Sequence, residues 1–273
     1  MNVLLVNDTS NFHCGSASVV NTITSVLADH NIISLSCKVP TIDFDSWDAV
    51  DHVIVNGEGT LHNNRQGAIS ILKLADSALN AGCTVSIVNS IWQNMDACWK
   101  TVTDRLTVWS VRDPISQQYA CREFGRLPSL CPDYSWFEPV SITHSNKNLT
   151  GVGGSFDGLL YPNWHDYHRV NIFENTWNQL VNLCAECNVL ISGRHHELYA
   201  SCRAETPFIA LDSNSWKNHA LTYHGNIPVL KHLPDTFAEI EKFVSTYKDQ
   251  YSKIFNWMHS YTLEDVQAHL LTR

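Results

Sequence analysis

The sequence contains no run of about eighteen consecutive apolar residues, the shortest stretch that is typical of a membrane-spanning helix. The start of the chain is apolar from Val3 to Val6 and has neither a basic segment nor a small-residue cleavage site, so no signal peptide is expected. The nine cysteines are scattered, and the single C-x-x-C pair, Cys184 and Cys187, lacks a second pair at zinc-site spacing. We therefore expect a cytoplasmic protein with reduced thiols, no transmembrane segment and no metal site.

Positive charge is also scarce in this chain. Its 18 lysines and arginines stand against 27 aspartates and glutamates, which gives a formal net charge of −9 with histidine neutral. Such a chain does not attract nucleic acid or an anionic membrane surface at long range, so no nucleic-acid partner is expected. The pattern G-x-G-x-x-G is absent after the first apolar run, which disfavours a nicotinamide cofactor. Any anionic ligand must be held locally by a few basic side chains.

Short apolar runs alternate with helical patterns in two successive blocks, as expected of parallel sheets that are covered on both faces. The first block predicts strands at residues 2–7, 33–39, 52–56, 84–89 and 107–111, and helices at 16–28, 66–81 and 114–124. The second predicts strands at 149–153, 188–192, 207–211 and 228–230, helices at 170–186 and 194–203, and C-terminal helices from residue 236 onward. A polar, proline-containing stretch at 128–148 has the composition of a linker. We predict an α/β fold with two Rossmann-like, doubly wound domains, residues 1–145 and 146–273.

An arginine and two histidines follow a short strand of the second block, where the chain turns into a helix. Arg194, His195 and His196 come directly after Gly193. In open α/β sheets this junction often holds the ligand, and an arginine beside a helix N-terminus suits a carboxylate or phosphate. The alternative is a helix start whose basic side chains face solvent. Lys217, after the strand at 207–211, is either a further charge on the same anion or a surface lysine.

The first strand of the N-terminal block ends in a polar loop at residues 7–16. Asp8 and His13 are candidates for a base or for ligand contacts, and Ser16 can cap the following helix. The alternative is a capped turn whose polar groups satisfy one another.

Two glycines flank Glu58 where the third strand ends, and His62 follows shortly after. Glycine lets a backbone approach a ligand closely, so Glu58 and His62 are candidate site residues; the alternative is a tight turn with Glu58 in solvent. At the end of the fifth strand, Arg112 either binds an acidic group or braces its loop through an ion pair, and Asp113 is expected to cap the helix that starts with Pro114.

Taken in order, these segments resemble the polysaccharide pyruvyl transferase family. The resemblance rests on residues 7–16, 56–62, 111–116, 131–133, 193–196 and 204–211 and on Lys217. It implies a two-domain design similar to GT-B glycosyltransferases, with the domains facing a cleft. It also implies an enzyme that moves the pyruvyl group of phosphoenolpyruvate onto a sugar of a polysaccharide as a ketal.

The family's R-x-H motif falls on Arg194 and His196, with His195 where the family usually has leucine, and Lys217 matches a lysine after the next strand. The resemblance thus implies that Arg194 and His196 hold the phosphate and carboxylate of the donor, and His195 and Lys217 are candidates for binding it. Asp8, Ser16 and Arg112 are further candidates for substrate binding. Phosphoenolpyruvate would be the donor substrate, a sugar or polysaccharide the acceptor, and no cofactor is implied. The start of the first helix departs from the family pattern, since residues 13–16 are His-Cys-Gly-Ser.

Ketal formation from an enol phosphate needs an acid, cations for the departing phosphate and a base for the attacking hydroxyl. His196 suits the acid and Arg194 the phosphate clamp, while Glu58, His62 or His13, expected on the opposite domain, is the candidate base. No metal is required, because arginine, lysine and helix amides can neutralise a phosphate.

Two alternatives remain open at this point. One is a GT-B-type glycosyltransferase that uses a nucleotide sugar, with Arg194 and Lys217 on the diphosphate and His13 or Glu58 as the base. The other is a non-catalytic glycan-binding protein with the same fold.

Overall fold

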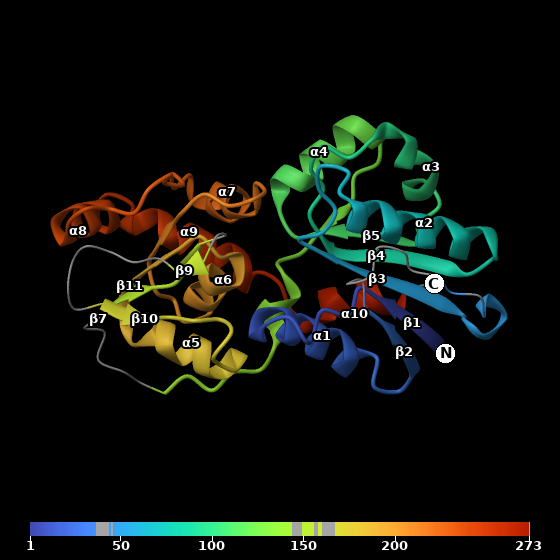
Figure 1. The fold of residues 1–273 in the computed structure, drawn as a ribbon, viewed down its shortest axis with the longest axis horizontal. Helices are drawn as coiled ribbons and strands as arrows, with labels where there is room; N and C mark the ends of the chain where they lie inside the picture. The colour runs from blue at the N-terminus through green and yellow to red at the C-terminus, as the bar shows by residue number, and fades with distance from the viewer. Residues whose placement is uncertain (37–43, 45, 144–148, 156–157, 160–166, 273) are drawn as a thin grey trace. The chain divides into compact units, whose positions relative to one another are not determined.

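The computed structural model describes residues 1–36, 44, 46–143, 149–155, 158–159 and 167–272 (Figure 1). They form two compact units. The first comprises Met1–Asn11, Val19–Tyr134 and Thr262–Arg273, and the second comprises Phe12–Ser18 and Ser135–Tyr261.

The first unit contains a parallel sheet with the strand order β2-β1-β3-β4-β5-β6. The strands are β1 (Asn2–Val6), β2 (Asn31–Leu35), β3 (His52–Glu58), β4 (Thr84–Ser90), β5 (Val108–Val111) and β6 (Ser129–Leu130). Residues 3–6 of β1 are completely buried, as expected of a strand that is covered on both faces. The sheet extends in both directions from β1, so the carboxyl ends of β1 and β3 flank the topological switch point, where such sheets bind ligands.

Helices cover both faces of this sheet. They are α1 (Cys14–Val26), α2 (Gln66–Asn80), α3 (Lys100–Thr103), α4 (Pro114–Phe124) and α10 (Leu263–Leu271), with 3-10 turns η1 (Trp47–Ala49) and η2 (Ala97–Trp99). Helix α2 packs against β3 and β4, and α10 packs against β4 and β5 on the other face (Figure 1). Helix α4 begins as predicted, because the Asp113 carboxylate accepts a hydrogen bond from the Ser116 backbone N–H.

The second unit contains a smaller parallel sheet with the strand order β10-β7-β11-β12. Its strands are β7 (Leu149–Val152), β10 (Tyr167–Arg169), β11 (Cys187–Ser192) and β12 (Phe208–Ala210), beside a two-stranded β8 (Gly154–Ser155) and β9 (Gly158–Leu159). Its helices are α5 (Trp177–Ala185), α6 (His195–Arg203), α7 (Lys217–Thr222), α8 (Phe237–Thr246) and α9 (Lys248–His259), with η3 (Tyr134–Phe137) and η4 (Tyr223–Gly225). The sheet again changes direction beside its first strand, so the carboxyl ends of β7 and β11 flank the switch point.

The division of the chain differs from the boundary near residue 145, a position outside the described residues. It falls after Tyr134, which is completely buried in the first unit, whereas Trp136 packs in the core of the second. Two short segments also belong to the other unit from the one that the predicted boundary gives them. Phe12–Ser18 belongs to the second unit and Thr262–Arg273 to the first, because the start of α1 contacts α6 and α10 covers the first sheet.

Several predicted elements need correction. The helix expected at 170–186 begins only at Trp177, because Thr176 and Gln179 form a capping box and the Asn175 amide folds back onto the Asn171 carbonyl. The strand expected at 228–230 is a single bridge between Leu211 and Leu230. Residues 37–39 of the strand expected at 33–39 lie outside the described residues.

Among the described residues, no helix combines the length and apolarity that crossing a membrane requires.

Candidate functional site

A buried carboxylate holds the carboxyl edge of the second sheet together. Glu197, in the first turn of α6, is only 1% exposed. One carboxylate oxygen accepts hydrogen bonds from the Gly154 N–H and the Ser192 hydroxyl, both at 2.7 Å, and the other accepts from the Ile172 N–H at 3.3 Å. Burial raises the pKa of Glu197, while these hydrogen bonds and Arg194 oppose that rise. The segments after β7, β10 and β11 are thereby fixed to α6.

Two glycines permit this arrangement. A Cβ on Gly153 would lie 2.0 Å from a carboxylate oxygen of Glu197, and a Cβ on Gly15 would lie 2.4 Å from Cβ of His196. Both distances are far shorter than a van der Waals contact. Gly15 therefore allows the first turn of α1 to approach α6, and Gly153 leaves room for the Glu197 carboxylate beside the end of β7.

Four basic side chains lie near one another in the same unit: His13, Arg194, His196 and Lys217. The rings of His13 and His196 meet at 5.1 Å between centroids. Burial is the main cause that lowers the pKa of His13 to about 3, and the neighbouring His196, Arg194 and Lys217 contribute to the same shift. The chain therefore concentrates positive potential at the switch point of the second sheet and at the N-terminus of α6, where an anion is stabilised.

Neighbouring side chains hold this cluster in place. The Asn218 amide donates hydrogen bonds to the carbonyls of Gly193 at 2.9 Å and Leu211 at 2.8 Å, which joins the segments that precede Arg194 and Lys217. His195 is buried, and its ring packs against Tyr199 at 4.6 Å between centroids. His195 therefore forms part of the α6 packing.

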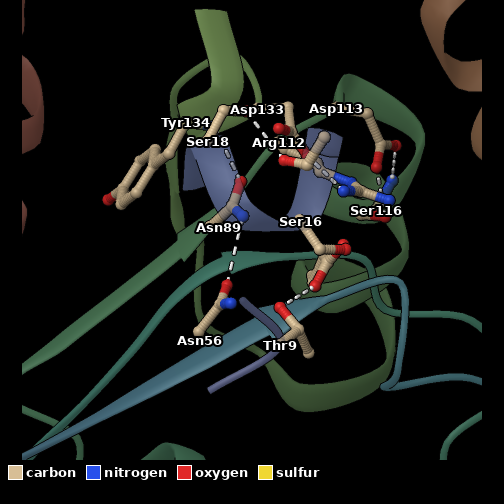
Figure 2. A network of polar contacts seen from close by, with 12 residues as sticks. Thr9, Ser16, Ser18, Asn56, Asn89, Arg112, Asp113, Ser116, Asp133 and Tyr134 are labelled. Atoms are coloured by element: carbon tan, nitrogen blue, oxygen red, sulfur yellow. Dashed lines mark hydrogen bonds and ion pairs between the residues drawn. The ribbon is translucent and has the colours of Figure 1, made fainter. Parts of the chain in front are cut away.

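The carboxyl edge of the first sheet is built differently, from a chain of side-chain amides (Figure 2). The Asn7 amide donates to the Asn56 carbonyl at 2.7 Å, the Asn89 amide donates to the Asn56 side chain at 3.2 Å, and the Tyr134 N–H donates to Asn89 at 3.1 Å. Asn7 and Asn89 both have positive φ angles, 65° and 52°. Asparagine tolerates this conformation, so the amides end β1 and β4 and also connect them.

An ion pair lies beside these amides. Arg112 donates through Nη1 to the Asp133 carboxylate, and the two side chains are 2% and 0% exposed (Figure 2). Asp113 accepts hydrogen bonds from the backbone N–H and hydroxyl of Ser116, both at 2.7 Å, while burial raises its pKa. Of the two roles considered for Arg112, the geometry therefore matches the ion pair that braces the loop.

Glu58 lies at the end of β3 in the same unit. It is 8% exposed, has an unusual φ of 40°, and accepts a hydrogen bond from the Thr9 hydroxyl at 2.7 Å. Backbone strain of this kind in a non-glycine residue is most frequent at functional sites. Asp8 accepts from the Ser10 N–H in its own turn, and His62 is buried with Nδ1 3.1 Å from the Asn63 amide.

The candidate residues thus fall into two groups. His13, Ser16, Arg194, His195, His196 and Lys217 lie in the second unit, and Asp8, Glu58, His62 and Arg112 lie in the first. His13 had been expected on the N-terminal domain, and this placement is corrected because Gly15 brings its turn against His196.

Sequence reasoning missed Glu197 and Asn218. An acidic residue in the third position of a helix usually signals a capping box, which points back to the helix's own start and gives no hint of bonds to the segments that follow β7 and β10. Asn218 follows Lys217 and carried no separate signal in the sequence.

Together, the two parallel α/β units define a Rossmann-like fold of the GT-B type, as the sequence predicted. No family model matches the sequence, and no curated protein matches it.

Solved structures do match the fold. UDP-GlcNAc 2-epimerase from Neisseria meningitidis bound to UDP-GlcNAc aligns with a TM-score of 0.59 at 11% identity, covering 100% of both chains. S. aureus MnaA in a structure with UDP aligns with a TM-score of 0.63 at 9% identity, covering 98% of this chain and 95% of that one. The glycosyltransferase SnogD from Streptomyces nogalater aligns with a TM-score of 0.56 at 11% identity, covering 99% of each chain. At these identities the likeness is one of fold.

Proposed function

We propose that this protein is a GT-B-type glycosyltransferase whose second unit binds the diphosphate of a nucleotide sugar. The observation that carries the proposal is the cluster of His13, Arg194, His196 and Lys217 at the switch point of the second sheet. An arginine fork, a lysine and a helix N-terminus are the groups that neutralise a phosphate ester in proteins and stabilise it as a leaving group.

The resting state of His13 suits the role of a hydrogen-bond donor to such a group. The Ser16 backbone N–H donates to Nδ1 of His13 at 3.1 Å, so the neutral ring carries its proton on Nε2. With a pKa of about 3 the ring stays neutral at physiological pH and is a weak base. We assign the acceptor side of the reaction to the first unit, where Glu58 is the proposed base.

Proteins with this fold support the choice of donor. The epimerase from Neisseria meningitidis is described with UDP-GlcNAc, MnaA with UDP, and SnogD as a glycosyltransferase. A nucleotide sugar presents two phosphates, which matches a cluster containing both an arginine and a lysine.

Pyruvyl transfer is the second candidate, and it is favoured by the Arg194-x-His196 motif followed by Lys217. In that reaction Arg194 and Lys217 would hold the phosphate and carboxylate of phosphoenolpyruvate, and His196 would protonate its methylene carbon. One sugar hydroxyl would add to the resulting cation and lose its proton to a base. Phosphate would then depart, and a second hydroxyl of the same sugar would bond to the same carbon and lose its proton, which completes the ketal.

Calorimetric titration of the full chain with UDP-glucose, UDP-GlcNAc and phosphoenolpyruvate separates the candidates. We expect a UDP-sugar to bind, and R194A to weaken that binding by at least about tenfold, because a charge-assisted hydrogen bond is lost. R203A is the matched control, since Arg203 lies at the far end of the same helix with its guanidinium over Trp136.

The other outcomes are equally specific. Binding of phosphoenolpyruvate alone, lost in R194A, would replace the proposal with pyruvyl transfer. Binding of glycans without either donor would instead indicate a non-catalytic glycan-binding protein.

A further inference from the structure

An exposed phenyl ring stands beside the basic cluster of the second unit. Phe173 is 54% exposed. The guanidinium carbon of Arg194 lies 4.8 Å from the centroid of its ring, and the His13 ring meets it at 5.7 Å with an interplanar angle of 82°. The ring therefore touches two members of the cluster while more than half of the residue remains in contact with solvent.

The backbone that carries this ring is fixed. The Phe173 N–H donates to the Asn171 side chain at 3.0 Å, the Ile172 N–H donates to Glu197 at 3.3 Å, and the Ile172 carbonyl accepts from the Cys14 N–H at 3.3 Å. The segment is thus tied to α6 and to the start of α1. The Glu197 carboxylate in the first turn of α6 therefore also fixes the backbone next to Phe173.

Burying a phenyl ring is favourable, and an apolar surface that stays exposed beside polar groups often marks a binding site. A phenyl face offers a stacking surface to any planar heterocycle, and a cation on the ring strengthens recognition of a ligand that also carries negative charge. Arg194 supplies that cation directly beside the ring.

We propose that Phe173 stacks on the nucleobase of the donor while Arg194 binds the donor's phosphate. This inference rests on the proposed function and narrows its substrate class to nucleoside diphosphate esters. A phosphate ester that lacks a planar ring gains nothing from this residue.

The test compares UDP with inorganic pyrophosphate, which carries the same diphosphate without a base. Dissociation constants are measured for wild type, F173A, F173W and R194A. The matched control is F237A, because Phe237 is a partly exposed phenylalanine of the same unit at the start of α8. Since Phe173 is exposed, its replacement is expected to leave the melting temperature unchanged.

In wild type we expect UDP to bind more tightly than pyrophosphate by about tenfold, the order of preference that stacking one base ordinarily provides. In F173A the dissociation constants for UDP and pyrophosphate should become similar, while pyrophosphate still binds. F173W and F237A should retain the preference for UDP. R194A should weaken the binding of both UDP and pyrophosphate.

If F173A retains the full preference for UDP, Phe173 does not stack on the base, and the proposed diphosphate site is unaffected by that result. If wild type binds pyrophosphate and UDP equally, the inference fails in the same way. If neither ligand binds, the donor site itself is absent, and the proposed function fails together with the inference.

Discussion

The two units carry the same kind of parallel sheet, yet the carboxyl edges of these sheets are chemically opposite. In the first unit Asn7, Asn56 and Asn89 bond to one another, and Arg112 is matched by the buried Asp133. In the second, Arg194, His196 and Lys217 surround His13, and the buried Glu197 carboxylate in α6 accepts hydrogen bonds from the neighbouring backbone. The first edge is joined internally by amides and an ion pair, and the second presents a local excess of positive charge.

This difference, rather than the fold, supports our proposal that the second unit binds the donor phosphate. Topology marks two switch points, one in each sheet, and makes both of them candidates for a ligand. Among the described residues, only the second brings together an arginine, a lysine and two histidines. We therefore attribute donor binding to the second unit from its side chains, and the following experiments test that contrast.

The largest effect is expected from exchanging the arginine of each edge for methionine. R112M leaves Asp133 as a buried carboxylate without its cation, which should lower the free energy of unfolding by about 3–5 kcal/mol. R194M removes a cation–π contact at a partly exposed site, worth about 0.5–1 kcal/mol, and its main effect should be weaker binding of UDP and pyrophosphate. Urea unfolding and calorimetry of both variants make the comparison.

The control for that pair is R122M, because Arg122 forms an ion pair with Glu123 while 71% exposed. It should change stability by no more than about 0.5 kcal/mol. An R194M protein as unstable as R112M would show that the basic edge is structural and would remove the contrast between the edges.

A smaller effect is expected from G153A. The new Cβ would clash with the Glu197 carboxylate, so the free energy of unfolding should fall by on the order of 2–3 kcal/mol. G67A is the control, since a Cβ there lies at an ordinary 3.5 Å from the Thr60 methyl, and alanine in α2 should leave stability unchanged or raise it by up to about 1 kcal/mol. Equal melting temperatures for both variants would mean that the position of the Glu197 carboxylate beside the end of β7 does not contribute to stability.

The smallest effect is a pH dependence. The pKa of His13 is lowered to about 3 and that of His224 to about 4, both chiefly by burial. In the unfolded chain these rings titrate near pH 6.5, so the unfolded state binds more protons below that pH. Their contribution to stability is complete above about pH 6.5 and is lost as the pH falls toward 4. The melting temperature should therefore be lower at pH 5 than at pH 7.5.

Ligand binding sharpens this test. A bound pyrophosphate would offset the positive charge of Arg194 and Lys217, which should raise the pKa of His13 toward its ordinary value. The saturated protein should consequently lose less stability on acidification than the protein alone. H224F should also flatten the profile, whereas H232Q, at an exposed histidine, should not. If pyrophosphate does not change the pH dependence of the melting temperature, the anion does not bind near His13.

Sequence patterns predict the first unit well because its strands are apolar runs bounded by polar residues. Strand β3 and helices α2 and α4 begin at the residues that the sequence indicated. The sequence gives little sign of β10, whose Tyr-His-Arg composition is that of a polar edge strand. It likewise predicts a helix through residues 171–175, where asparagine side chains form a turn instead.

The candidate site is only partly readable from the sequence, for a related reason. Arg194 and His196 are identifiable because a strand, a glycine and a helix start follow one another locally. The place of His13 depends on how closely Gly15 packs on a helix far along the chain, and that of Glu197 depends on three separate strand ends. Such long-range contacts leave no periodic signal, so they emerge only from the folded chain.

The return of α10 to the first unit has a consequence for biosynthesis. Val266 and Leu270 are completely buried, and Tyr134 Oη lies 3.0 Å from Nδ1 of His269. On the ribosome, every segment of the second unit emerges before this helix does, so the parts of β4 and β5 that α10 covers remain uncovered until the second unit has been synthesised. The first unit, whose first strand is synthesised earliest, is therefore completed only after the second unit has been synthesised.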